Sequence, residues 1–129
     1  MDKLNPNKII KITIPLPPVT KKNSAEIWRN SKTGRPFTVP SSQYREYEKA
    51  AVLFLQPLQI DYPVNVKAVY YMPTRRRVDL INLHSALHDV LVKGGVVIDD
   101  NCKIIVSTDG SRVEYDKNNP RTEIEIRRV

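Results

Sequence analysis

The stretch VNVKAVYYMPTRRRVDLINLHSALHDVLVKGGVVIDD, residues 64–100, decides the fold. From Val64 to Met72 apolar and polar residues alternate, with a proline at each side, which is typical of a half-buried strand. Three arginines and Asp79 come next. The apolar residues that follow recur at helical spacing: Leu80, Leu83, Leu87, Val90 and Leu91. The stretch therefore predicts a strand and then an amphipathic helix that packs on a sheet.

Polar residues mark both ends of the predicted helix. Asp79 is a good N-cap, because its side chain can accept a backbone N–H of the first turn. Asn82 lies one turn further on the same face, about 4.5 Å along the axis. Gly94 and Gly95 end the helix, and a short apolar run then leads to a second acidic site, Asp99–Asp100.

The remainder of the chain predicts four further elements. Alternating isoleucines predict a strand over 10–14, which the prolines at 15, 17 and 18 end. Ser41 or Ser42 can cap a helix that carries Tyr44, Tyr47, Ala51, Phe54 and Leu55 and stops near 56. Residues 103–107 and 122–127 predict two more strands. The order β-α-β-α-β-β favours one α+β domain, residues 1–129, with helices on one face of a mixed sheet.

Residues 19–40 predict a long basic loop, with room for a short hairpin around 32–34. Such a loop is usually functional or disordered. Five cations surround Trp28 and Phe37: Lys21, Lys22, Arg29, Lys32 and Arg35. Two interpretations stay open. The rings and cations suit nucleic-acid bases and backbone, or the loop is a solvated connection with both rings packed on the core.

The composition of the chain indicates which kinds of binding partner and cellular compartment suit it. The chain of 129 residues has a formal charge of +7 and a pI near 9.6, which favours a polyanionic partner. No apolar run approaches the ~20 residues of a membrane span. With one cysteine, Cys102, no intrachain disulfide or thiolate zinc cluster forms, so a reducing cytoplasm suits the chain.

The acids suggest a divalent metal, since Mg²⁺ takes oxygen ligands. Asp89 lies about 15 Å along the helix from Asp79, too far for a shared ion, and is expected to be a solvated charge or to pair with an arginine. If the chain at Asp99 and Asp100 is extended, only one of the two enters a site. Arg75, Arg76 and Arg77 precede Asp79, so phosphate-binding cations would lie beside a metal ligand. This is the equipment of a phosphodiesterase acting on nucleic acid.

His84 and His88 are spaced i and i+4, like a helical metal pair. No Glu lies between them, as a zinc-protease pattern requires. Surface or interface histidines are the favoured interpretation.

These motifs resemble the RusA family of Holliday junction resolvases, found in bacteria and their phages. The resemblance is carried by Met72-Pro73, Arg75-Arg76-Arg77, Asp79-Leu80, Asn82-Leu83, Leu91, Gly95 and Asp99-Asp100, and by Ile14-Pro15-Leu16-Pro17-Pro18 followed by Lys22-Asn23-Ser24. It implies a homodimer of α+β subunits that nicks four-way DNA junctions with Mg²⁺ or Mn²⁺, in the cytoplasm and on the nucleoid when bound to DNA.

By the resemblance, Asp79 and Asp100 are the first and last catalytic acids and hold the metal. Asn82 and Asp99 are neighbours that match the motif. From their residue types and positions, we expect five cations to bind the flanking phosphates: Arg75, Arg76, Arg77, Lys21 and Lys22.

Two positions depart from the family pattern: Ile81 stands where a second catalytic aspartate is usual, and Ser85 where a lysine is usual. Asp99, Asp109 or Asn82 then completes a rearranged site, or the protein binds DNA and cuts it poorly. A basic RNA- or protein-binding module, in which the acids are merely a cap and a turn, is the third interpretation.

Overall fold

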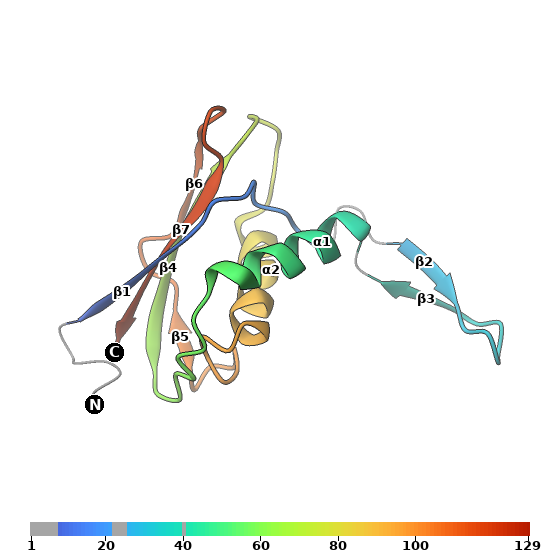
Figure 1. Ribbon diagram of the computed structural model, residues 1–129, viewed down its shortest axis with the longest axis horizontal. Coiled ribbons are helices and arrows are strands. Elements are labelled where there is room, and N and C mark those ends of the chain that lie inside the picture. Colours follow the sequence, from blue (N-terminus) through green and yellow to red (C-terminus); the bar gives the residue numbers. More distant parts are fainter. Residues whose placement is uncertain (1–7, 22–25, 40) are drawn as a thin grey trace.

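The computed structural model describes residues 8–21, 26–39 and 41–129 (Figure 1). Lys22 therefore lies outside the described residues. The strands are β1 (Ile9–Ile14), β2 (Glu26–Arg29), β3 (Pro36–Val39), β4 (Val64–Met72), β5 (Ile105–Ser107), β6 (Arg112–Tyr115) and β7 (Arg121–Arg128). The helices are α1 (Ser42–Ala51), the short 3₁₀ helix η2 (Val52–Phe54) and α2 (Leu80–Lys93).

The main sheet is mixed, as the sequence predicted. Its order is β1-β7-β4-β5, and β6 also pairs with β4. β7 runs antiparallel to both β1 and β4, whereas β5 and β6 are parallel to β4. Parallel neighbours need a long crossover connection, and α2 is that connection between β4 and β5. The strand–helix stretch quoted above therefore sets the topology.

The helices lie on one side of this sheet (Figure 1). In β7 the buried residues Thr122, Ile124 and Ile126 alternate with half-buried ones, so one face is packed and the other is solvated. Leu83, Leu87 and the other buried residues of α2 join the tyrosines of α1 and the sheet in one core cluster. The predicted α+β fold, with helices on one face, is confirmed.

Helix α1 begins as predicted but ends early. The Ser41 hydroxyl accepts the Tyr44 backbone N–H at 3.1 Å, and both Tyr44 and Tyr47 are buried. After Ala51 the chain tightens into η2, where residues advance by about 120° rather than 100°. Residues after Ala51 therefore no longer lie on the same face as Tyr44 and Tyr47, and Phe54 is 46% exposed. Its assignment to that face was wrong.

The chain after α2 is held by main-chain bonds to the segment that precedes β4. Gly95, at φ +73°, turns the chain in the left-handed conformation that favours glycine. The Ile60 N–H then donates to the Val96 carbonyl, and the Ile98 N–H donates to the Ile60 carbonyl, each at 3.0 Å. These bonds fix the backbone immediately before Asp99.

Buried Asn65 secures the irregular start of the β4–β5 pairing. Its Oδ1 accepts the Ser107 hydroxyl at 2.5 Å and the Asp109 backbone N–H at 2.8 Å, while its Nδ2 donates to the Asp109 carbonyl at 3.2 Å. The pairing register shifts beside this residue, so the side chain replaces lost ladder bonds.

Much of the predicted loop 19–40 is a β-hairpin. β2 and β3 form a separate two-stranded sheet in which Trp28 lies opposite Phe37. The hairpin was more extensive than the short one expected around 32–34. The described residues 27–37 of the hairpin are exposed. Its sequence therefore lacks the alternation of apolar and polar residues by which a half-buried strand is recognised.

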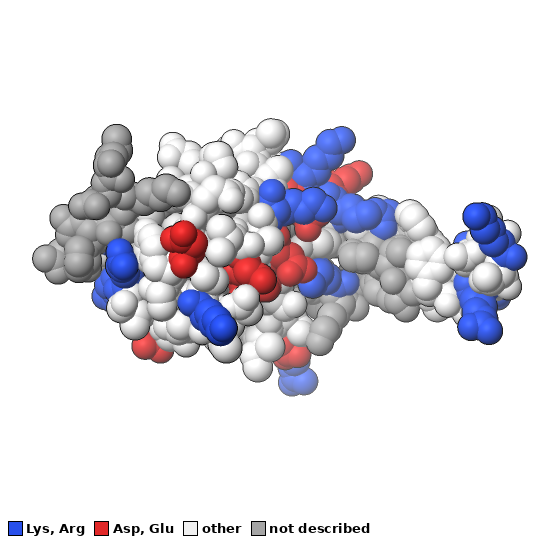
Figure 2. All heavy atoms as spheres, turned by 90° about the horizontal axis from the view of Figure 1, so that it is seen from below, with Lys and Arg blue, Asp and Glu red and all other residues white. Residues whose placement is uncertain are grey.

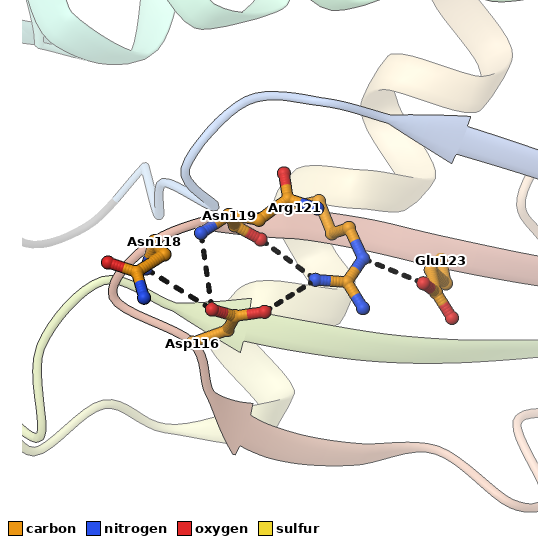
Figure 3. Close-up of polar contacts among 5 residues, drawn as sticks. All are labelled: Asp116, Asn118, Asn119, Arg121 and Glu123. Carbon is orange, nitrogen blue, oxygen red and sulfur yellow. Dashed lines mark hydrogen bonds and ion pairs between the residues drawn. The ribbon is translucent and has the colours of Figure 1, made fainter.

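A polar cluster closes the turn between β6 and β7 (Figure 3). The Arg121 guanidinium donates to Asp116 at 2.9 Å, to Glu123 at 2.7 Å and to the Asn119 carbonyl at 2.8 Å. It also lies 3.8 Å from the centre of the Tyr71 ring. Because its Nε and Nη1 donate within this turn and the guanidinium lies on the Tyr71 ring, Arg121 has a structural role.

Candidate active site and nucleic-acid interface

Asp79 occupies the N-cap position of α2 but does not cap it with its side chain. Its carbonyl accepts the first helical bond, from the Leu83 N–H at 3.1 Å. Its carboxylate accepts only a long bond of 3.4 Å from the Asn82 amide and makes no capping bond. The predicted capping bond was wrong. The exposed carboxylate remains able to bind a cation, with Asn82 beside it.

Asp99 and Asp100 have different roles. Asp99 Oδ1 accepts the Asp100 backbone N–H at 2.7 Å, and its Oδ2 accepts the Asn101 amide at 3.0 Å. Asn101 in turn accepts the Lys103 N–H at 2.9 Å. Asp99 is thus engaged in shaping the turn, which leaves Asp100 as the better ligand of the pair.

The surroundings of Asp100 are acidic. Partial burial, and after it the negative charge of Asp89, raise the pKa of the Asp100 carboxyl above its usual range; its hydrogen bond with Asp99 acts in the same direction. Asp89, Glu48 and Asp100 line one open hollow together with Val92 and Lys93. A bound cation would relieve the repulsion between these carboxylates.

Two acids of this hollow are paired with lysines, one in its lining and one beside it. Lys21 forms an ion pair with Asp89, so its ammonium is engaged there rather than free for phosphate. Lys93 Nζ lies 3.2 Å from a Glu48 carboxylate oxygen, and the other oxygen accepts the Tyr44 hydroxyl at 3.0 Å. Asp89 had been expected to be solvated or to pair with an arginine; its partner is a lysine.

The proximity of Asp89 to Asp100 was missed in the sequence. Asp89 was set aside because it lies far along α2 from Asp79, and that spacing holds. Asp100, however, lies beside the carboxyl-terminal half of the helix, next to Asp89 and Lys93, whereas Asp79 is at the amino end. Sequence periodicity describes one helix and carries no signal for the loop that folds back against it.

The donor set suits a hard divalent cation, because carboxylate oxygens are the ligands that Mg²⁺ and Mn²⁺ prefer. Within the described ranges no three His, Cys, Asp or Glu side chains converge as a ready metal cage. Mg²⁺ usually keeps several waters and takes one or two carboxylates. Of the three acids that line the hollow, Asp100 is the one for which the described residues show no ion pair.

His84 and His88 form a stack, not a metal pair. Their rings lie 5.6 Å apart at an interplanar angle of 5°, and His84 Nδ1 is hydrogen-bonded to the Tyr70 hydroxyl at 2.7 Å. Burial lowers the pKa of His88 to about 4. Both are half-buried, which does not fit plain surface histidines, and their place at an interface stays a prediction; the stacked rings do not converge on a common ligand.

The three arginines are exposed between β4 and α2. The Arg75 guanidinium lies 4.2 Å from the centre of the Tyr115 ring. Arg76 and Arg77 line a hollow with Pro18–Thr20, the segment that leads directly to Lys21 and its partner on α2. Residues 18–21 therefore line a hollow with these two arginines at one end, through Pro18–Thr20, and pair with Asp89 of the acidic hollow at the other, through Lys21.

Figure 2 shows how charge is distributed on one face. Acidic side chains gather near the middle of the body. Lysine and arginine side chains lie beside them and at the tip of the protruding hairpin. Such an arrangement lets cations hold a polyanion while acids hold a metal against it.

Ile81 is the most conspicuous departure. Its side chain is 79% exposed although it is a large aliphatic residue two positions after Asp79, whereas Ser85 is half-buried. An exposed isoleucine contributes no ligand at the amino end of α2.

Comparison with known proteins identifies the family of the chain. No helix in the described part of the chain is both long and apolar enough to cross a membrane. A search of curated proteins found no match. The family model described as "Endodeoxyribonuclease RusA" matches residues 15–127, nearly the whole chain. The matched region contains the arginine run, both ends of α2 and the acid pair, and the chain belongs to the RusA endodeoxyribonuclease family.

Proposed function

We propose that this protein is an endodeoxyribonuclease that resolves four-way DNA junctions by paired nicks, using Mg²⁺ or Mn²⁺. Family membership supports the reaction class. The observation that carries the proposal is the hollow in which Asp100 lies with Asp89 and Glu48, where partial burial and the charge of Asp89 raise the pKa of the Asp100 carboxyl. A divalent cation bound there would offset the repulsion between Asp100 and Asp89.

In this proposal each group has one task. Asp100 binds the metal, and Asp99 holds the turn that presents it. The bound ion supplies a Lewis acid that stabilises charge on the scissile phosphate. Arg75, Arg76 and Arg77 bind flanking phosphates, with guanidinium forks that suit phosphate oxygens.

Asp79 is proposed to complete the site as the family's first catalytic acid. Within one subunit it lies at the other end of α2 from Asp100. A two-fold dimer in which α2 packs antiparallel to its copy would place the amino end of one helix beside the carboxyl end of the other. The same symmetry suits a junction with two equivalent strands.

A non-cleaving junction-binding protein is the second candidate, and exposed Ile81 favours it. It has the same scaffold and cations but lacks one acid. It would bind junctions with steep salt dependence, through counterion release, and would leave them intact with every metal.

Ile81→Asp distinguishes the two functions. If the site is active but weakened by the missing acid, the substitution raises the rate of junction cleavage by about tenfold, because an added ligand strengthens metal binding. The measurement is single-turnover cleavage of a synthetic four-way junction over a range of Mn²⁺ concentrations.

Ile81→Asn is the matched control, since it removes the apolar side chain without adding charge. Equal rates for the Asp and Asn variants would show that loss of the isoleucine, not gain of a ligand, is responsible. Absence of cleavage in the wild type and in both variants would support the binding protein.

A further inference from the structure

We propose that the β2–β3 hairpin is a DNA-binding element that stacks Trp28 and Phe37 against bases exposed at a branch point. The inference deepens the proposed function and rests on it for the identity of the polymer. The hairpin protrudes from the body (Figure 1). Trp28 is 47% exposed and Phe37 44% exposed, so neither ring is buried in the core.

The Trp28 and Phe37 rings contact each other across the two strands of the hairpin. Trp28 and Phe37 are cross-strand partners, and their centroids lie 6.4 Å apart in an edge-to-face arrangement. The Arg45 guanidinium lies 5.0 Å from the Trp28 ring centre and connects it to α1. Ile27, on the same strand, is 74% exposed. Two-stranded hairpins alone are marginally stable in water, and this one leaves the large rings of Trp28 and Phe37 about half exposed.

The turn of the hairpin is well formed. Asn30 Oδ1 accepts the backbone N–H groups of Lys32 at 2.8 Å and Thr33 at 3.1 Å. The Gly34 N–H donates to the Asn30 carbonyl at 2.8 Å, and the Arg29 guanidinium donates back to the Gly34 carbonyl at 3.0 Å. These bonds hold the basic residues around the rings at a defined place, which reduces the entropy lost on binding.

The positive charge of the hairpin favours a polyanion as its binding partner. Arg29, Lys32 and Arg35 are exposed, and Glu26, the first residue of β2, is the only acid in the sequence from 26 to 39. A second copy of this basic chain would bring like charges together, whereas a polyanion is attracted. Aromatic rings flanked by cations bind nucleic acid by stacking and by phosphate contact.

Stacking also explains which DNA would be preferred. In a continuous duplex the faces of the bases are covered by their neighbours. At a branch point some of those faces become accessible, and each base stacked on an aromatic ring adds affinity without regard to sequence. The hairpin therefore favours branched over linear DNA, while its cations bind both.

Trp28 reports on this contact directly, because it is the only tryptophan of the chain. The experiment titrates the full chain, without metal, with a synthetic four-way junction or a linear duplex of the same length. We expect the junction to quench Trp28 fluorescence strongly and the duplex to quench it little. Unchanged fluorescence at saturating junction would overturn the proposal.

Substitutions separate stacking from charge. Trp28→Ala is expected to raise the junction Kd about tenfold and the duplex Kd much less, and Trp28→Phe to restore most of the loss, because a ring remains. Lys32→Ala weakens both DNAs and lowers the salt dependence. Lys11→Ala, an exposed cation of β1 on the opposite side of the molecule, is the charge-matched control. Equal effects of Lys11→Ala and Lys32→Ala would contradict a specific role for the hairpin.

The remaining outcomes are also decisive. A Trp28 signal that changes with protein concentration in the absence of DNA, and not with junction, would assign the hairpin to subunit contact and overturn the proposal. Junction-specific quenching without cleavage in any metal would leave the hairpin inference standing and refute the nuclease. Equal junction cleavage and equal junction Kd for the wild type and Trp28→Ala would refute the hairpin inference and leave the proposed nuclease function standing.

Discussion

Asp100→Asn is expected to lower the rate of metal-dependent junction cleavage by about 100-fold or more. The change keeps the size of the side chain and removes its charge. A bound metal stabilises the transition state by several kcal/mol, and each 1.4 kcal/mol is about tenfold in rate. Junction binding should be retained or become tighter, because a negative charge near the phosphates is lost. The measurement is single-turnover cleavage at saturating protein, with a parallel binding titration.

Asp61→Asn is the matched control. Asp61 is an exposed acid that is not among the residues lining the acidic hollow, so its substitution should leave the cleavage rate unchanged. Wild-type cleavage by Asp100→Asn would remove Asp100 from the site. A similar loss in both variants would point to a general effect of charge.

Mixed dimers extend this test to the relation between Asp79 and Asp100. If each site combines Asp79 of one subunit with Asp100 of the other, a dimer of one Asp79→Asn and one Asp100→Asn subunit contains one intact site. Mixing the two inactive variants should then restore nicking of a single strand. If both acids act within one subunit, the mixture stays inactive, which would contradict the antiparallel arrangement of α2.

The second large effect concerns stability. Leu87→Ala should lower the free energy of unfolding by about 2–5 kcal/mol, since Leu87 is only 2% exposed between α2 and the sheet and its loss leaves a cavity. Domains of this size are typically stable by about 5–15 kcal/mol, so the loss is a large fraction of the total. Urea denaturation followed by circular dichroism measures it.

Leu53→Ala, in η2, is the control. Leu53 is 81% exposed, so its truncation should change the unfolding free energy by no more than about 0.5 kcal/mol. Comparable losses at the two positions would mean that the effect at Leu87 is not one of core packing. No loss at Leu87 would contradict the packing of α2 on the sheet.

The elements with strong burial periodicity were predictable from the sequence. α2 carries an apolar period that matches the face it buries, and Gly94 marks the helix end. β4 was predictable as a strand, but it is buried on more than the face that its alternation predicts, because it lies inside the sheet. β6 and the hairpin carried no such signal, because their residues are largely exposed and tertiary pairing, not burial, makes them strands.

The acidic site was predictable only in part. The arginine run, Asp79 and the acid pair could be singled out because their residue types and order suggest phosphate and metal chemistry. The proximity of Asp89 and Asp100 could not, since it depends on how the loop after Gly95 returns along α2. Lys21 likewise was expected to meet phosphate, and its ion pair with Asp89 arises from a long-range contact.

The most direct test of the central claim is a crystal soaked in Mn²⁺ and measured at a wavelength where manganese scatters anomalously. The account predicts an ion with an Asp100 carboxylate oxygen in its coordination sphere, at about 2.1 Å. Manganese bound only elsewhere, for example at the His84–His88 stack, or no ordered ion at millimolar Mn²⁺, would contradict it.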